Sequence, residues 1–210
     1  MARKTKEEAA ETRALLLDTA ERLFSAKGVS RTSLADIADA AGLTRGAIYW
    51  HFENKAAVFN AMADSICLPL EEALQPDASG HFTNPLGQLQ DALVQVLQDT
   101  ETDERQRRVF DVLFNKCEYT DDIEAVVVRR REATIDGAER RKELLHQAIL
   151  QGQLPAGLNV ARADCLLLSF LTGVLNNWLF MPDQFSLRDE ALPMVASMIE
   201  MLKTSETLRT

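Results

Sequence analysis

The sequence predicts an all-α protein, with a small N-terminal unit of three helices and a larger C-terminal helical bundle, about nine helices in total. Apolar residues recur at positions i, i+3, i+4 and i+7 through most of the chain. No stretch alternates apolar and polar residues for long enough to form a strand. Glycine, proline and capping residues separate the periodic stretches and so mark the ends of the predicted helices.

The first predicted helix runs from Glu7 to Lys27 and is ended by Gly28. Residues 1–6 are expected to form either a disordered basic arm or a plain frayed terminus. The apolar face of the helix consists of Leu16, Ala20, Leu23 and Phe24.

Two short helices joined by a tight turn are predicted within residues 32–55. Ser33 is a suitable N-cap for the first helix, and Asp36 lies in its first turn, where an acidic side chain is favourable. Gly42 can adopt the left-handed conformation that ends a helix, and Thr44 can cap the next one. The inward-facing residues are Leu34, Ile37, Ala38, Ala41, Ile48 and Phe52. Two helices joined by such a turn, packed on a preceding helix, form a helix-turn-helix unit.

A fourth helix is predicted to start after the N-cap Asn54, to run through Ile66 and to be interrupted or kinked at Pro69. Residues 75–84 have the composition of a loop, and Pro85 then begins another helix. The inner face of that helix comprises Leu86, Leu89, Leu93, Val96 and Leu97.

The remaining elements are also predicted to be helical. Residues 100–103 are expected to be a polar break, followed by an apolar stripe in residues 109–114. A long helix is predicted over residues 120–151, and two further helices are predicted over residues 160–180 and 187–202.

One part of the sequence resembles a known family. The run TRGAIYWHFENK, preceded by SLADIADAAG and by TRALLLDTAERLFSAKGVSRTS, resembles the DNA-binding segment of TetR-family repressors. This match is specific over residues 10–58. The opening MARKTKEEAAETR and the later FNKCEYTDD resemble the AcrR-like subgroup, whose members repress multidrug efflux pumps.

The second helix of the helix-turn-helix carries the residues expected to read DNA. In a major-groove helix, the first turn reaches base edges and the flanking residues contact phosphates. Arg45 suits a two-pronged contact to guanine O6 and N7, although a solvated helix charge is the alternative. His51 could equally make a hydrogen bond inside the unit, and Trp50 is left open between core and surface. The predicted DNA-binding set is Thr32, Ser33, Thr44, Arg45, Gly46, Tyr49, Trp50, His51 and Lys55.

The charge distribution limits how far composition supports DNA binding. The net charge is −9, but residues 1–55 hold nine basic and eight acidic side chains, whereas residues 56–210 hold fourteen and twenty-four. The prediction therefore depends on where the basic residues lie. They are Arg3, Lys4, Lys6, Arg31, Arg45 and Lys55.

Several function classes are not supported by the sequence. Cys67, Cys117 and Cys165 lack metal-site or disulfide-frame spacing, so we expect free thiols and no metal. GxGxxG, P-loop, HExxH and GxSxG motifs are absent, so we expect neither an enzyme nor a cofactor. The N-terminus has no apolar signal region, and polar residues interrupt the apolar run 165–181, which predicts a buried helix rather than a membrane span. We therefore expect a cytoplasmic protein without a membrane partner, associated with the nucleoid when DNA-bound.

The resemblance implies a drug-sized cavity enclosed by the fourth to eighth helices. Thr172 and Asn176 are polar positions on an apolar stripe, where they could orient a ligand, although such a stripe is usually plain core. The expected lining is Ile66, Cys67, Leu70, Leu93, Val96, Phe110, Phe114, Leu168, Leu171, Thr172, Leu175 and Asn176.

The resemblance also implies a homodimer formed by the last two helices. These helices carry more apolar residues than one bundle needs. The expected interface residues are Ala163, Leu167, Phe170, Val174, Trp178, Met194, Met198 and Met201.

Together these features predict a ligand-responsive repressor that binds a palindromic DNA operator as a homodimer and is released by a small hydrophobic or amphipathic inducer. Residues 1–68 would form the DNA-binding domain with its linking helix, and residues 69–210 the ligand-binding and dimerisation domain. An efflux-pump operon is the expected target. The alternatives are a TetR-like regulator of fatty-acid or aromatic catabolism, an activator, and a helical enzyme or scaffold with an incidental helix-turn-helix.

Overall fold

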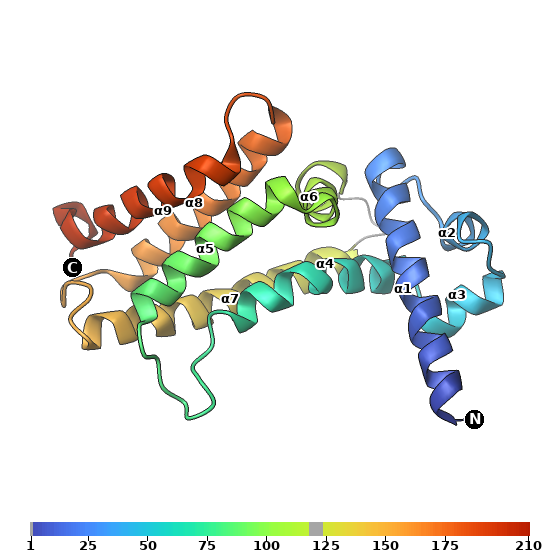
Figure 1. Ribbon diagram of the computed structural model, residues 1–210, viewed down its shortest axis with the longest axis horizontal. Coiled ribbons are helices and arrows are strands. Elements are labelled where there is room, and N and C mark those ends of the chain that lie inside the picture. Colours follow the sequence, from blue (N-terminus) through green and yellow to red (C-terminus); the bar gives the residue numbers. More distant parts are fainter. Residues whose placement is uncertain (1, 118–123) are drawn as a thin grey trace. The chain divides into compact units, whose positions relative to one another are not determined.

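The computed structural model describes residues 2–117 and 124–210, and this part of the chain folds into nine α-helices without a strand (Figure 1). The helices are α1 (Ala2–Lys27), α2 (Leu34–Ala40), α3 (Arg45–His51), α4 (Lys55–Glu72), α5 (Pro85–Thr102), α6 (Glu104–Asp111), α7 (Glu124–Leu150), α8 (Val160–Phe180) and α9 (Leu187–Thr204). A π-helical turn (Val112–Lys116) follows α6, and a 3-10 turn (Glu206–Leu208) lies near the end of the chain. The predicted all-α fold class is confirmed.

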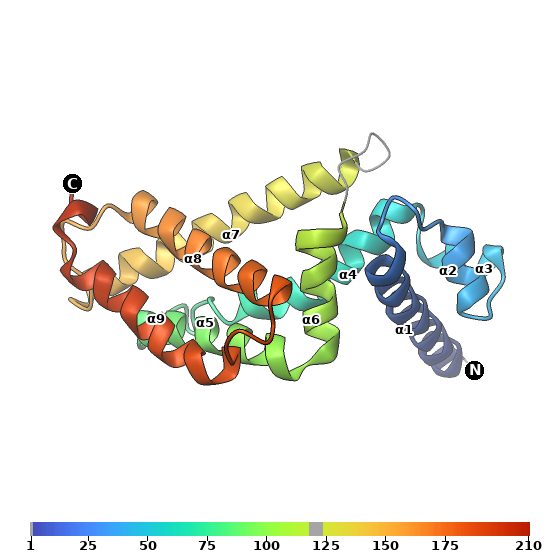
Figure 2. The same ribbon diagram turned by 90° about the horizontal axis from the view of Figure 1, so that it is seen from above.

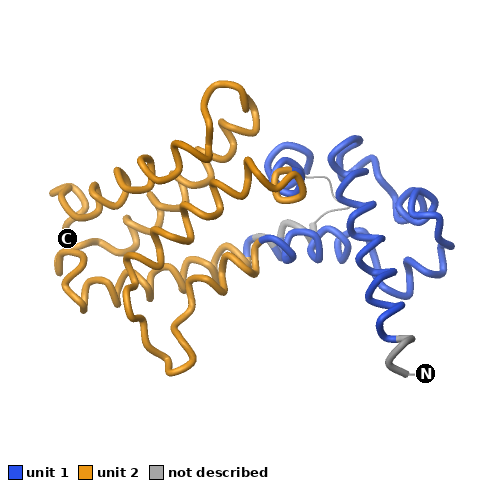
Figure 3. The backbone as a smooth tube through the Cα atoms, in the orientation of Figure 1, with its two compact units in different colours: residues 1–66, 108–131 blue, residues 67–107, 132–210 orange. Residues whose placement is uncertain are grey.

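The helices form two compact units, which are coloured separately in Figure 3. The first unit contains residues 1–66 and 108–131, and the second contains residues 67–107 and 132–210. The sequence assigned residues 108–131 to the C-terminal domain, whereas the described residues of this segment, 108–117 and 124–131, group with the first unit. One reason is visible in that unit, where the backbone N–H of Val29 donates to the carbonyl of Lys116 over 3.1 Å.

The core of the first unit is built where α1 packs against α2 and α3. Leu16, Ala20 and Phe24 of α1 are fully buried. The rings of Phe24 and Phe59 lie 6.4 Å apart, which adds the start of α4 to the same core. Burial of these large apolar side chains, each worth about 1.5–3 kcal/mol, holds together helices too short to be stable alone.

The local signals that delimit α2 and α3 are confirmed. Ser33 and Asp36 form a complete capping box, in which the Ser33 hydroxyl accepts from the Asp36 N–H and the Asp36 carboxylate accepts from the Ser33 N–H. Gly42 has a φ of 69°, the left-handed conformation that lets the chain turn after α2. The Thr44 hydroxyl accepts from the N–H of Ala47 and so caps α3.

Two predicted boundaries differ from the structure, and part of a third lies outside the described residues. Helix α1 already begins at Ala2, because its first residues include alanine, lysine, arginine and glutamate, all good helix formers, and no glycine or proline. Helix α4 continues through Pro69 to Glu72, and the Pro69 carbonyl still accepts from the N–H of Ala73. Residues 120–123 of the predicted long helix lie outside the described residues.

The predicted break at residues 100–103 is also shorter than expected, because α5 extends to Thr102. Thr100 is fully buried, and its hydroxyl donates to the Val96 carbonyl over 2.6 Å. Gln106 donates to the same hydroxyl over 3.2 Å, so both polar side chains are satisfied inside the protein. The chain turns at Asp103, whose carboxylate accepts from the N–H groups of Arg105 and Gln106 at the start of α6.

In the second unit α9 lies along α5, with α8 packed beside them (Figure 2). The predicted inner face of α5 is confirmed, since all five of its apolar residues are buried. Glu101 of α5 accepts from the N–H of Arg188 over 2.6 Å and so binds the first turn of α9. Helix α7 adds a largely buried ion pair in which Arg141 Nε lies 2.6 Å from Asp164 of α8.

Helix α8 is buried on one side only. By length and composition it is the one helix in the described residues that could span a membrane, and 28% of its most apolar window is buried. Ala163, Leu167 and Trp178 belong to the core, and the Trp178 indole N–H donates to the Phe185 carbonyl. The predicted role of these three residues and of buried Met198 in a dimer interface was therefore wrong, because the same face that the pattern identified is used inside the unit. The exposed side instead carries residues such as Cys165 and Ser169.

Removal of the capping box gives a test of this local account. Ser33→Ala should lower the free energy of unfolding by about 1 kcal/mol, because an N-cap hydroxyl is lost. Asp39→Ala, an exposed change in the same helix, should not destabilise the protein. Urea unfolding monitored by circular dichroism measures both variants, and equal destabilisation would contradict the cap assignment.

The same cap should be pH-dependent. Hydrogen bonds from the Ser33 hydroxyl and N–H lower the pKa of Asp36, so its contribution is present above the unfolded pKa, about 4, and is lost as pH falls through the lower folded pKa. The difference in stability between the wild type and Ser33→Ala should therefore shrink on acidification.

Candidate nucleic-acid interface

Helix α3 is fixed on one side and open on the other. Ile48 is fully buried and Phe52, at its C-terminal end, is 3% exposed, so the two side chains anchor the helix to the first unit. On the open side, Arg45 is exposed, and Tyr49 and Trp50 are 59% and 73% exposed. Neighbouring apolar side chains that are exposed together are typical of an interaction surface. The structure therefore settles the position of Trp50, which lies at the surface.

Gly46, in the first turn of α3, is not required by the fold. A Cβ at this position would meet only the Thr44 hydroxyl, at 3.8 Å, and its φ is not positive. The absence of a side chain here leaves the backbone accessible next to Arg45.

The C-terminal end of α3 is joined to α1 by His51, Phe52 and Arg13. The Arg13 guanidinium lies 5.1 Å from the centre of the Phe52 ring, a favourable cation–π arrangement. The His51 ring contacts that of Trp50 edge to face, with centroids 4.5 Å apart. Partial burial lowers the pKa of His51, and the nearby charge of Arg13 lowers it further, which favours a neutral imidazole at neutral pH.

Besides Thr44, three residues of the predicted DNA-binding set form side-chain hydrogen bonds within the protein. Thr32 is 1% exposed and its hydroxyl donates to the Gly28 carbonyl, so the expected phosphate contact is contradicted by its burial. The Lys55 ammonium donates to the Ser30 carbonyl over 3.1 Å, which leaves two of its three protons for another acceptor. Ser33 is exposed, but its hydroxyl serves the capping box.

Arg13 was not identified from the sequence. The sequence offered one indication of its role: Arg13 lies three residues before the buried Leu16, so the two side chains are neighbours on the same face of the helix. Nothing in the sequence indicated that Phe52 lies beneath it.

The predicted ligand-binding residues fall into both units. Ile66, Phe110 and Phe114 belong to the first, where the last two rings stack with centroids 6.0 Å apart. The other nine belong to the second. Among these, the buried members are Leu93, Val96 and Leu175, and the half-buried members are Cys67, Leu70, Leu168, Leu171 and Thr172.

The two polar members of this set do not behave alike. The Thr172 hydroxyl donates to the Leu168 carbonyl one turn earlier, which leaves its oxygen as an acceptor. Asn176 is exposed, so the expectation that it orients a ligand inside an apolar cavity was wrong. The helical spacing puts Asn176 next to the apolar stripe of α8, but its side chain lies on the exposed side of the helix. Among the described residues, no group of three His, Cys, Asp or Glu side chains could hold a metal.

Sequence comparison assigns both parts of the chain. Residues 16–62 match the bacterial regulatory proteins of the tetR family, and residues 84–204 match the C-terminal region of MAATS-type transcriptional repressors. The AcrR transcriptional regulator of Shigella flexneri is 42% identical over 212 residues, which cover 100% of this chain and 97% of that protein.

Solved structures agree with this assignment. NalD, the secondary repressor of the MexAB-OprM multidrug efflux pump of Pseudomonas aeruginosa, is 34% identical with a TM-score of 0.83, and the match covers 95% of this chain and 99% of NalD. SmeT, the repressor of the Stenotrophomonas maltophilia efflux pump SmeDEF, superposes as a complex with triclosan with 26% identity and a TM-score of 0.83, over 93% of each chain. These relatives are transcriptional regulators and not enzymes. The chain belongs to the TetR family of transcriptional regulators.

Proposed function

We propose that this protein is a transcriptional repressor that binds a palindromic operator through α3. The observation that supports this most directly is the anchored helix α3, with Arg45, Tyr49 and Trp50 on its open face. A rigidly held helix with a polar and aromatic face has the form of a major-groove recognition helix.

Individual roles follow from position and chemistry. Arg45, in the first turn, would read guanine through two parallel hydrogen bonds, and Gly46 would let the DNA backbone approach closely. Thr44 and Tyr49 would contact phosphates, as would the remaining protons of Lys55. Neutral His51 would donate one ring N–H to a phosphate, and Trp50 would contact sugar or base-edge methyl groups. Thr32 is left out of this set because it is buried.

The repressor would act as a homodimer through the exposed faces of α8 and α9. Leu192 and Met201 on α9 and Phe180 at the end of α8 are large apolar residues that the monomer leaves exposed. On α8, Cys165, Ser169 and Gly173 recur every four residues, and small side chains in such a row let two helices approach closely. A two-fold pair of α3 helices about 34 Å apart would match successive major grooves.

The regulated genes would encode a multidrug efflux pump. NalD and SmeT are repressors of such pumps, and SmeT forms a complex with the apolar phenol triclosan. We therefore propose that hydrophobic drugs bind among the apolar side chains of α4, α5 and α8, including Leu70, Leu168 and Leu171, and lower operator affinity. Residues 1–68 would serve DNA binding, and those of residues 69–210 that lie in the second unit would serve effector binding and dimerisation. The site of action would be the cytoplasm.

Loss of the Arg45 side chain tests DNA reading. Arg45→Ala should weaken binding to the DNA upstream of the protein's own gene by about 1–3 kcal/mol and relax preference at one base position. Arg188→Ala, which removes an exposed arginine from the second unit, should have little effect. Fluorescence anisotropy with specific and scrambled duplexes measures both affinities. If the Arg45 variant loses affinity for both duplexes equally, its assigned base contact is wrong.

A charge on the exposed side of α8 tests the dimer. Ser169→Arg should give monomers in sedimentation velocity, because it places a long cation in the proposed close helix contact. His146→Arg, at an exposed position of α7, should remain dimeric. A wild-type monomer at micromolar concentration, or a dimeric Ser169→Arg variant, would contradict the proposed interface.

Triclosan tests the effector response. It should release operator DNA from the wild type, and Leu171→Trp should require at least about tenfold more, since a large side chain occupies apolar space and only differential binding can shift the equilibrium. Ala156→Trp, at an exposed turn, is the control for surface changes. The titration uses labelled operator at fixed protein concentration. Equal responses of all three proteins would show that Leu171 does not line the effector site.

A further inference from the structure

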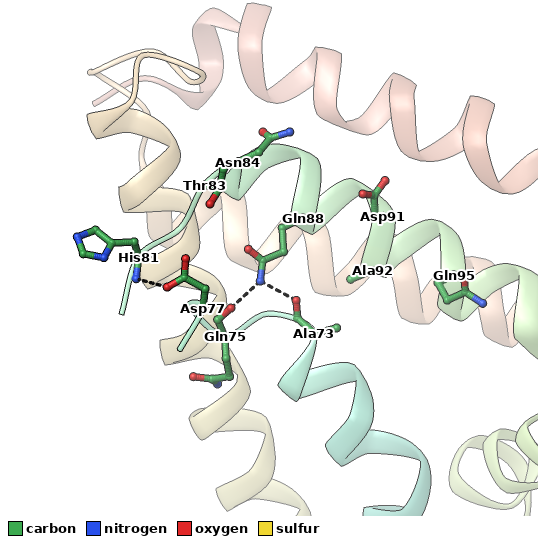
Figure 4. A pocket seen from close by; sticks show the side chains of 10 residues that line it. All are labelled: Ala73, Gln75, Asp77, His81, Thr83, Asn84, Gln88, Asp91, Ala92 and Gln95. Atoms are coloured by element: carbon green, nitrogen blue, oxygen red, sulfur yellow. Dashed lines mark hydrogen bonds between the residues drawn. The ribbon is translucent and has the colours of Figure 1, made fainter. Parts of the chain in front are cut away.

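The second unit contains a groove that the proposed DNA-binding and drug-binding residues do not use. It has a volume of about 590 Å³ and lies between the end of α4, the loop that follows, and the first three turns of α5 (Figure 4). None of the twelve residues predicted to bind a hydrophobic ligand lines it. Eight of its ten lining residues have polar side chains, and their apolar stems together with Ala73 and Ala92 supply the larger part of its surface.

Helix α5 supplies one wall in a regular row. Gln88, Asp91 and Gln95 are spaced at i, i+3 and i+7 and all line the groove, whereas the opposite side of the helix carries the buried leucines of the core. Seven residues of α-helix span about 10 Å, so the row is long enough to meet more than one charged group of a ligand.

Hydrogen-bond donors in this wall are largely consumed within the protein. The Gln88 amide nitrogen donates to the carbonyls of Ala73 and Gln75 over 2.8 and 2.7 Å, as Figure 4 shows. The Gln95 amide nitrogen donates to Asp99 over 2.6 Å. The two amide oxygens have no such partner in the described residues. Both amide oxygens can therefore still accept hydrogen bonds, and Gln95 keeps one N–H that can donate.

The permanent charges in the groove have one sign. Asp77 and Asp91 line it together with the imidazole of His81, and no lysine or arginine does. Hydrogen bonds from the Ser79 hydroxyl and from the N–H groups of His81 and Ser79 lower the pKa of Asp77, so it is ionised at neutral pH. Neither carboxylate forms an ion pair within the part of the chain that the structure describes. Two carboxylates without an ion-pair partner, beside neutral acceptors, create a negative local potential.

We propose that this groove binds a linear organic polycation of the polyamine class. A primary ammonium carries three donors and no acceptor, which complements a lining of carboxylates and amide oxygens. Methylene segments between the charges would lie over Ala73 and Ala92. A bare metal ion does not fit the same residues, since the described residues bring no three carboxylate, imidazole or thiolate groups together. This site would be separate from operator and drug binding, so its test does not depend on them.

Isothermal titration calorimetry of the full-length protein with spermidine measures binding directly. Asp91→Asn should weaken binding about fivefold, the effect of losing one solvent-accessible ion pair. Ala92→Lys should abolish it, because its own ammonium would occupy the groove on a helix that tolerates lysine well. The matched control Ala156→Lys adds the same charge at an exposed turn and should bind spermidine like the wild type.

Two further titrations distinguish a specific binding site from an acidic surface that attracts any cation. Butylamine, with a single ammonium group, should bind at least about tenfold more weakly than spermidine if two carboxylates act together. Magnesium chloride at the same concentration should not displace spermidine. The proposal is overturned if Asp91→Asn binds like the wild type, if the two lysine variants weaken binding alike, or if magnesium competes equally.

Discussion

The rest of the first unit depends on the burial of Ile48 and Phe52 beneath α3. A helix of seven residues has no stability of its own in water, so its conformation and its orientation both come from this packing. Helix α1 supplies the surface through Leu16, Ala20 and Phe24, and it also reaches the end of α3 through Arg13. Because the anchors are apolar and the outer face carries no core residue, side chains on the outer face can specify a DNA sequence without altering the fold.

Polar side chains play a different part in the second unit, where they join helices at defined positions. The pair Arg141–Asp164 connects α7 to α8, and Glu71 of α4 is paired with Arg140 on the neighbouring position of α7. A buried ion pair adds little net stability, but removing one partner leaves an uncompensated charge, so such pairs favour one arrangement of helices over others. An effector that binds in this unit must therefore act on helices whose relative positions these ion pairs already fix.

Local features of the fold were predictable from the sequence, and features that need a partner distant in sequence were not. The capping box of Ser33 and Asp36 and the inner face of α5 are encoded within a few residues, and both are present. Thr32 and Trp178 were misassigned because a polar or aromatic residue in a pattern does not reveal whether the protein or a ligand satisfies it. Here the Gly28 and Phe185 carbonyls do so. Helical periodicity likewise identified an apolar face of α8 without showing which side the core had already taken.

Electrostatics connects the proposed functions. Residues 1–55 are nearly neutral overall, so specific DNA contacts such as that of Arg45 must contribute more than general attraction to phosphate. The excess of carboxylates in residues 56–210 would repel DNA from any surface on which they lie exposed. The same excess of carboxylates is compatible with a groove that binds cations, since no lysine or arginine lines the groove to repel them. A polycation, however, also binds DNA directly and competes for its phosphates. The effect of a polycation on operator occupancy would therefore have two contributions, its binding to DNA and its binding to the protein, and these depend differently on salt. Only the binding to the protein would respond to a change at Asp91.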